Sequence, residues 1–257
     1  MPHQLLTISH HLARVTLHNP PANVLNLDVL KELEQVLNGL EEDDYVRVVI
    51  ITGTGRFFCA GADVNELAHL RSAHGGSEFA LRGQSLFNRI ERLNKPVLAA
   101  INGTCVGGGL ELALACHVRV AAEGIQLGLP EVKLGLIPGF GGTQRLPRVV
   151  GASKAAEMIL TGESVSAEEA WRIGLVSRVV PSRDLLDQTA ALASQIASRG
   201  KDAVEATLHA IRGGLDIPLS EGLAREAELF GRLCATPEKQ EAVQAFLEKR
   251  QTKFADV

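Results

Sequence analysis

Hydrophobic and polar residues alternate with different periods along this chain, and each period predicts a type of element. Short apolar runs at residues 5–9 and 12–18 predict two strands joined by a turn at His10 and His11. A β-branched run at residues 46–52 is typical of a buried parallel strand. Between these strands, leucines recur every three or four positions, as they do on the buried face of a helix: Leu27, Leu30, Leu33, Leu37 and Leu40.

The same alternation continues through the middle of the chain. Residues 96–101, 118–121 and 175–180 predict further strands, and residues 63–71 and 77–93 predict helices. Strands that alternate with helices imply parallel strands joined by crossover helices. We therefore expect an α/β fold.

Glycines mark two connections in this half of the chain. Residues 53–63 contain several glycines and two phenylalanines, and we expect them to form an ordered loop. His74, Gly75 and Gly76 stand between the two predicted helices, where we expect a flexible break.

From residue 184 onward the pattern is helical throughout. This change predicts a core with the active site at residues 1–197 and a helical region for oligomerisation at residues 198–257. A helical tail after an α/β core packs back on that core or on a neighbouring subunit. The four helices expected there are residues 184–198, 201–212, 218–233 and 237–250.

Composition narrows the class of protein. The 257 residues are 46% hydrophobic and 22% charged, which suits a soluble globular chain. A net charge of −4 without a long basic run argues against nucleic acid as a partner. The four cysteines form no CxxC pair, and no apolar run reaches the roughly 20 residues of a membrane span. Together these features predict a cytoplasmic protein with no membrane partner.

One stretch combines an anion site with a carboxylate. An apolar strand ends at Ile101, three glycines follow at residues 107–109, and a helix of small residues then begins. Glycine lets the backbone approach a ligand closely, and the first amides of a helix lack intrahelical partners. Glu111 lies one turn into this helix, and Glu131 follows Pro130 in a similarly apolar, glycine-rich segment.

Two carboxylates that share one site would have different pKa values and would supply one base and one acid. Simpler interpretations stay open at this point. Glu111 would then only compensate the helix dipole, and Glu131 would belong to an ordinary turn.

A second backbone donor is available at residues 60–63, at a loop-to-helix junction. The amide of Ala62 beside that of Gly108 would form an oxyanion hole. Taken alone, these residues are better explained by Asp63 as a helix cap.

Other common sites are missing from the sequence. It contains no dinucleotide fingerprint, P-loop or Gly-x-Ser-x-Gly elbow. It also has no His-x-x-x-His or cysteine cluster that would indicate a metal site. His117, at the end of the glycine-led helix, is interpreted as a structural residue.

Four segments, in this order and spacing, resemble the crotonase superfamily and look most like its enoyl-CoA hydratases: residues 58–63, 95–103, 107–112 and 139–147. The resemblance runs nearly end to end. It implies a crotonase-like spiral of ββα units with a C-terminal helical trimerisation region. It also implies a homotrimer or a homohexamer built from two trimers.

The resemblance also implies roles for particular residues. The amides of Ala62 and Gly108 would bind the thioester oxygen of an acyl-CoA substrate. Glu111 would activate a water molecule, Glu131 would exchange a proton with the α-carbon, and Gly139 would help to position the water through its backbone. No cofactor and no metal would be needed, because coenzyme A is part of the substrate. Residues at family positions for CoA contact are Val24, Ala60, Asp63, Phe230 and Lys249.

Within this superfamily, isomerases typically keep one acid/base group, so the presence of both glutamates favours hydration. The alternatives are an enoyl-CoA isomerase and a hydratase for branched-chain acyl-CoA. An acyl-CoA-binding scaffold subunit without activity is a third, lower-ranked possibility. Acyl chain length and metabolic pathway are not fixed by these residues.

Overall fold

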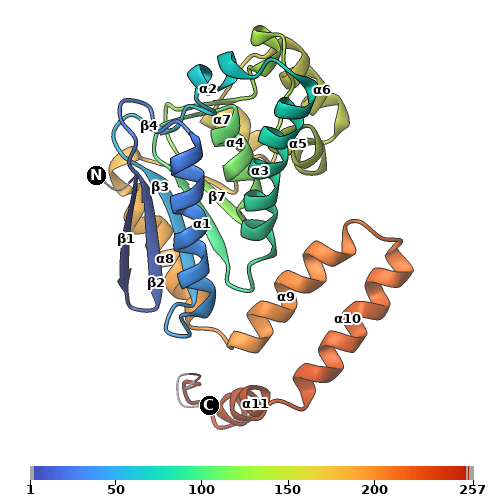
Figure 1. The fold of residues 1–257 in the computed structure, drawn as a ribbon. Helices are drawn as coiled ribbons and strands as arrows, with labels where there is room; N and C mark the ends of the chain where they lie inside the picture. The colour runs from blue at the N-terminus through green and yellow to red at the C-terminus, as the bar shows by residue number, and fades with distance from the viewer. Residues whose placement is uncertain (1–2, 253, 255–257) are drawn as a thin grey trace.

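A six-stranded sheet forms the centre of the protein (Figure 1). The structure is a computed structural model, and it describes residues 3–252 and 254. The strand order is β1-β2-β3-β5-β7-β10; β1 and β2 pair antiparallel, and all later neighbours pair parallel. This arrangement confirms the predicted α/β fold with parallel strands. The strands are β1 (Gln4–Ser9), β2 (Leu12–Leu17), β3 (Val48–Gly53), β5 (Val97–Ile101), β7 (Val118–Ala122) and β10 (Arg178–Val180).

A second, four-stranded sheet follows the order β4-β6-β8-β9. Its strands β4, β6 and β8 come directly after β3, β5 and β7 of the main sheet, so the chain passes from one sheet to the other before the next helical segment. This repeat is the expected series of ββα units. The strands are β4 (Phe57–Cys59), β6 (Thr104–Val106), β8 (Gln126–Gly128) and β9 (Val165–Ser166).

Helices cover both faces of the main sheet. α1 (Leu27–Glu42) and α3 (Ala73–Arg92) lie on one side, and α8 (Leu185–Ala197) packs against β2, β3, β5 and β7 on the other (Figure 1). The Asn26 side chain accepts a hydrogen bond from Val29 N and starts α1. Leu30, Leu33, Leu37 and Leu40 of α1 are buried, as predicted, and Leu27, the first residue of the helix, is only partly buried.

The expected break at residues 74–76 is wrong. α2 (Val64–His69) ends before it, but α3 begins at Ala73 and runs through both glycines. The Ser72 side chain accepts from Gly75 N at 3.1 Å, and the Ser72 carbonyl accepts from Gly76 N at 3.0 Å. This N-cap offsets the cost of about 1 kcal/mol that a glycine adds to a helix.

The last predicted strand is shorter than expected. β10 begins at Arg178, because the amides of Leu175 and Val176 donate to the Ala170 carbonyl instead of pairing in the sheet. The remaining helical elements before α8 are α4 (Gly108–Ala115), 3₁₀ helix η1 (Glu131–Leu134), α5 (Gly142–Val150), α6 (Ala152–Thr161), α7 (Ala167–Arg172) and 3₁₀ helix η2 (Ser182–Asp184).

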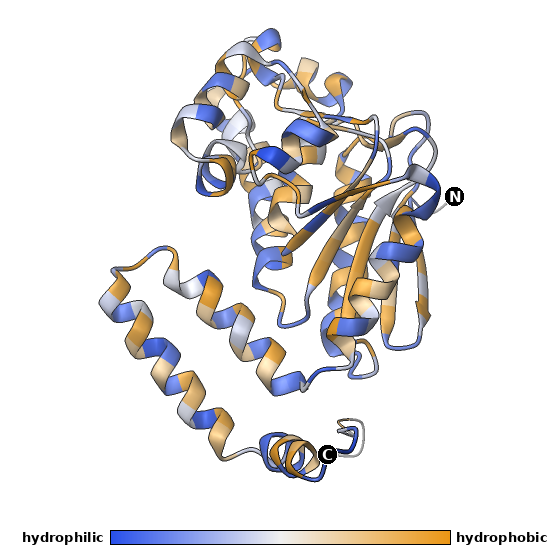
Figure 2. Ribbon diagram, turned by 180° about the vertical axis from the view of Figure 1, so that it is seen from behind, coloured by the Kyte–Doolittle hydropathy of each residue, from blue (hydrophilic) through white to orange (hydrophobic). Residues whose placement is uncertain are grey.

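Three helices at the C-terminal end project from the core (Figures 1 and 2): α9 (Lys201–Gly214), α10 (Leu219–Cys234) and α11 (Pro237–Leu247). α9 and α10 pack on each other and have no buried residue between them. The proposed domain boundary after residue 197 falls where α8 ends. No helix in the described residues is long and apolar enough to cross a membrane. Large apolar residues that these three helices expose include Ile211, Leu215, Leu219, Phe230, Phe246 and Leu247.

Candidate active site

Two backbone amides meet where α4 begins. Gly107 adopts a φ of +55° that favours glycine, and it leads the chain from β6 into α4. Gly108 is the first residue of that helix, so its N–H lacks an intrahelical acceptor. A Cβ added to Gly108 would lie 3.3 Å from the nitrogen of Ala62. The two amides therefore lie next to each other.

A short parallel bridge between Leu25 and Ala62 holds the second amide in place. Leu25 N donates to the Gly61 carbonyl at 2.8 Å, and Asp63 N donates to the Leu25 carbonyl at 3.3 Å. The bridge thus uses the Gly61 carbonyl and the Asp63 N–H and leaves the N–H of Ala62 unused. In the part of the chain that the structure describes, neither Ala62 N–H nor Gly108 N–H donates to a protein acceptor. The pair has the form of an oxyanion hole.

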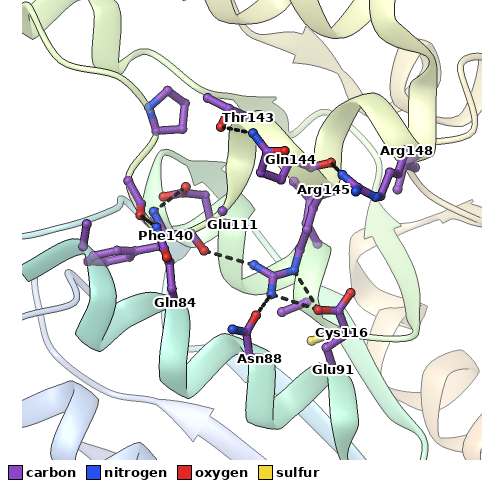
Figure 3. Close-up of a pocket in the computed structure, with 18 of the residues that line it drawn as sticks. Gln84, Asn88, Glu91, Glu111, Cys116, Phe140, Thr143, Gln144, Arg145 and Arg148 are labelled. Carbon is purple, nitrogen blue, oxygen red and sulfur yellow. Dashed lines mark hydrogen bonds and ion pairs between the residues drawn. The ribbon is translucent and has the colours of Figure 1, made fainter. Parts of the chain in front are cut away.

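Glu111 is the buried carboxylate of α4, with 2% of its surface exposed. Its Oε1 atom accepts two hydrogen bonds of 2.7 Å, from the backbone amides of Phe140 and Gly142 (Figure 3). Burial raises the pKa of Glu111 to about 7, and the nearby charge of Glu131 adds to the rise. The two amides and the Arg145 guanidinium act in the opposite direction on this pKa.

Glu131 is the first residue of η1 and is partly buried. A Cβ added to Gly107 would lie 3.0 Å from its Oε1 atom, so the carboxylate lies beside the turn that leads into α4. Its Oε2 atom is buried without a protein partner. Burial raises the pKa of Glu131 above its usual range. A protonated carboxyl suits this position.

The two carboxylates and the two amides line one pocket of about 1320 Å³. α3 contributes one wall through residues such as Phe79, Ala80 and Gln84. Leu67 of α2 and Leu70, the C-cap of that helix, also line the pocket. The predicted site residues that the structure brings together in this pocket are Ala62, Gly108, Glu111, Glu131 and Gly139.

The residues expected to contact CoA lie elsewhere. Val24, Ala60 and Asp63 belong to the segments around the Leu25 bridge, and Asp63 also caps α2 by accepting from Asn65 N. Phe230 is 69% exposed on α10, and Lys249 follows α11. None of the five is among the described residues that line the pocket. Their contact with CoA stays a prediction.

The backbone of Gly139 is partly engaged. Its carbonyl accepts from Gln84 Nε2 at 2.8 Å, so its N–H is the group left for the predicted water. The amide donors of Phe140 and Gly142 and the side chains of Gln84 and Arg145 were not predicted as site residues from the sequence. Three of these four residues lie in the segment 139–147, which carries part of the family resemblance and could have indicated them.

His117 has two backbone partners. Its Nδ1 atom accepts from Val97 N at 2.9 Å, and its Nε2 atom lies 3.2 Å from the Glu91 carbonyl. Burial lowers the pKa of His117, which favours the neutral ring that this pattern needs. The contacts agree with a structural role. Within the described residues, no group of three or more His, Cys, Asp or Glu side chains is arranged to hold a metal ion.

Comparison with known proteins defines the class. The family model for enoyl-CoA hydratase/isomerase matches residues 7–257. The chain belongs to this family, which confirms the resemblance found in the sequence.

Individual relatives cover almost the whole chain. A probable enoyl-CoA hydratase of Bacillus subtilis is 45% identical over 97% of both chains. A short-chain-enoyl-CoA hydratase of Clostridium acetobutylicum is 42% identical over 93% of this chain and 92% of that protein. The crystal structure of enoyl-CoA hydratase from Bacillus anthracis superposes with a TM-score of 0.94, at 40% identity and 98% coverage of both chains. The fold is therefore that of the crotonase superfamily, with the C-terminal helices present.

Proposed function

We propose that this protein is an enoyl-CoA hydratase, a hydro-lyase that adds water reversibly to a trans-2-enoyl-CoA and gives a 3-hydroxyacyl-CoA. One observation carries the assignment of the site: two buried or partly buried carboxylates and two unused backbone amides line the same pocket. Hydration needs a base for water, an acid for carbon, and donors for the charge on the thioester oxygen.

The oxyanion hole would act on the thioester carbonyl. As water attacks C3, electrons of the double bond move toward the carbonyl, and negative charge grows on its oxygen. The N–H groups of Ala62 and Gly108 would stabilise this enolate-like state. In a comparable case, the loss of one such donor costs about 2.7–4 kcal/mol.

The two glutamates divide the proton transfers. Two N–H donors stabilise the charged form of Glu111, so Glu111 is the base that takes the proton of the attacking water. Glu131 has one oxygen without a donor, so it holds the proton that is passed to C2. The bond from the water oxygen to C3 forms as the C2–C3 double bond becomes single, and the proton on Glu131 completes the product. Gly139 N–H would help to hold the water.

The assembly and the remaining contacts belong to the same proposal. The apolar residues that α9, α10 and α11 expose support association with further copies of the chain. The family resemblance suggests a homotrimer, or a homohexamer of two trimers, and we propose that the enzyme is cytoplasmic. Phe230 and Lys249 would then contact the CoA of a neighbouring subunit, and Val24, Ala60 and Asp63 the CoA bound to their own. Sedimentation of the full chain tests the assembly, and a monomer at micromolar concentration would contradict it.

Hydration of crotonyl-CoA, followed by loss of the absorbance of the conjugated thioester, tests the function. Glu111→Gln and Glu131→Gln should each lower kcat by about 10²-fold or more, because each removes one acid/base group. Glu157→Gln, at an exposed position of α6, is the matched control. Wild-type turnover in either active-site variant would refute the role of that glutamate. Isomerisation of 3-enoyl-CoA faster than hydration would favour the isomerase instead, and binding without turnover a scaffold subunit.

A further inference from the structure

The segment Gly139–Gly142 supplies both donors to Glu111. The carbonyl oxygens of its peptide groups accept hydrogen bonds from other residues. In a trans peptide the carbonyl and the N–H point in opposite directions, so a bond to the carbonyl oxygen also directs the N–H of the next residue. Phe140 N–H shares its peptide with the Gly139 carbonyl, and Gly142 N–H shares its peptide with the Gly141 carbonyl. The partners of these carbonyls therefore set the direction of the two donors.

Gln84 fixes the first peptide. Its Nε2 atom donates to the Gly139 carbonyl at 2.8 Å from the middle of α3, and the N–H on the other side of that peptide donates to Glu111. The second donor is fixed by backbone alone, since the Gly141 carbonyl accepts from the amides of Gln144 and Arg145 at 3.0 and 2.8 Å.

Arg145 fixes the peptide between these two. Its Nη1 atom donates to the Phe140 carbonyl at 3.0 Å, and the side chain is held in turn by α3. Nη2 donates to Asn88 Oδ1 at 2.6 Å and to Glu91 Oε2 at 2.9 Å, and Nε donates to the same Glu91 oxygen at 3.2 Å. Arg145 is only 9% exposed, so these partners replace the water that a guanidinium needs. Figure 3 shows the guanidinium between Phe140 and the two α3 side chains.

The fit around Arg145 is close. Gly141 has a φ of +114°, and a Cβ added there would lie 2.2 Å from the Nη1 atom. Any other residue at this position would displace either the guanidinium or the loop. The loop and the arginine thus hold one another in a single arrangement.

We propose that Gln84 and Arg145 are positioning residues: Gln84 aims the Phe140 amide at Glu111, and Arg145 holds the next peptide, which connects that donor to Gly142. The charge of Arg145 also favours the ionised base. The inference rests on the proposed function, because it concerns the base of that reaction. Neither residue contacts the reacting atoms in this proposal. The charged groups that face Glu111 are Glu131 from η1 and Arg145 from α5, with Glu91 of α3 behind the arginine.

The test compares kcat, KM and the pH profile of crotonyl-CoA hydration in Arg145→Lys, Arg145→Gln and Gln84→Met. Displacement of a catalytic group by about 1 Å costs up to ~10²-fold in rate. We expect kcat to fall by about 10- to 100-fold in all three variants, with KM changed by less than about threefold. The acidic limb of the profile should move to higher pH in Arg145→Gln and stay near its wild-type position in Arg145→Lys, which keeps the charge.

Arg89→Gln is the matched control. Arg89 lies on α3, as Gln84 does, and like Arg145 it binds carboxylate and asparagine side chains. Its partners are Glu34, Glu41 and Asn38, and it does not line the pocket. Its kcat and pH profile should be those of the wild type.

Wild-type kcat in both Gln84→Met and Arg145→Lys, with Glu111→Gln inactive, would overturn this inference and leave the proposed function intact. Wild-type turnover in Glu111→Gln would instead refute the proposed function. If Arg145→Gln fails to fold, Gln84→Met and Glu91→Gln decide the matter, because both retain the Arg145 side chain: Gln84→Met frees the Gly139 carbonyl, and Glu91→Gln weakens the support of the guanidinium. An unchanged kcat in these two variants would also overturn the positioning role of Gln84 and Arg145.

Discussion

Replacement of Glu111 by glutamine should stabilise the protein at neutral and alkaline pH while it abolishes turnover. The carboxylate is buried, and its pKa in the folded chain is about 7, against an ordinary value of 4.5. Glutamine has nearly the same shape, and its side-chain oxygen can accept from the amides of Phe140 and Gly142. The variant therefore keeps the loop in place but removes the cost of ionising a buried acid.

The magnitude and its pH window follow from these two pKa values. Below pH 4.5 the carboxyl is protonated in both folded and unfolded chains, and ionisation costs nothing. Between pH 4.5 and about 7 the unfolded chain releases the proton first, so the wild-type free energy of unfolding falls as pH rises. Above pH 7 the full cost is present. At about 1.4 kcal/mol per pH unit, it amounts to about 3 kcal/mol.

Thermal unfolding monitored by circular dichroism between pH 5 and 8.5 measures this effect. We expect the Tm of Glu111→Gln to exceed that of the wild type by several degrees at pH 8, at roughly 2–4 °C per kcal/mol for a chain of this size. The difference should shrink toward pH 5. Glu157→Gln, at an exposed site, should follow the wild type. Parallel Tm curves for the wild type and Glu111→Gln across this range would refute the reasoning.

Two further predictions concern stability. The pKa of His117 is lowered and its Nδ1 accepts from Val97 N, so the folded chain favours the neutral ring. The neutral ring therefore stabilises the fold above the ordinary pKa of 6.5, and this stabilisation is lost as pH falls below that value. His117→Asn should flatten the decline in Tm between pH 7 and 5, and an equally steep decline in the variant would contradict this role. Gly109→Ala should lower the free energy of unfolding by about 1–3 kcal/mol in urea, because a Cβ there would lie 2.2 Å from the Cys59 carbonyl oxygen. Gly39→Ala, at a helical position with open space around it, is the control and should raise the free energy of unfolding by about 0.5–1 kcal/mol. Equal effects of the two substitutions would show that crowding at residue 109 is unimportant.

The sequence was most informative where a pattern extends over a whole element. The leucines of α1 and the β-branched residues of β3 identified a helix and a buried strand close to their observed bounds. Periodicity did not predict the strands of the second sheet, because they have only two or three residues, too few to show a period of two. Only the family resemblance implied ββα units. The Ser72 cap, which keeps α3 continuous through residues 75 and 76, was also missed.

The candidate site was predictable only in part. Glycines and an apolar setting made Ala62, Gly108, Glu111 and Glu131 candidates, and the family resemblance gave them roles. The structure places all four on one pocket. Gln84 lies 55 positions from the carbonyl it binds, and Arg145 lies 54 positions from Glu91. No local pattern in one sequence predicts such distant contacts, and the identity of a residue does not show in which direction its peptide N–H points.

The key donors of this pocket, at residues 62, 108, 140 and 142, belong to the main chain and not to side chains. An alanine scan would therefore delete none of these N–H groups, and an effect at Gly108 or Gly142 would come from the crowding of the added Cβ. Only the exchange of a single amide for an ester by chemical ligation deletes one such N–H while it preserves the side chain. Among the encoded residues only proline lacks this N–H, so a point mutation cannot delete one donor without also changing the backbone or the packing around it.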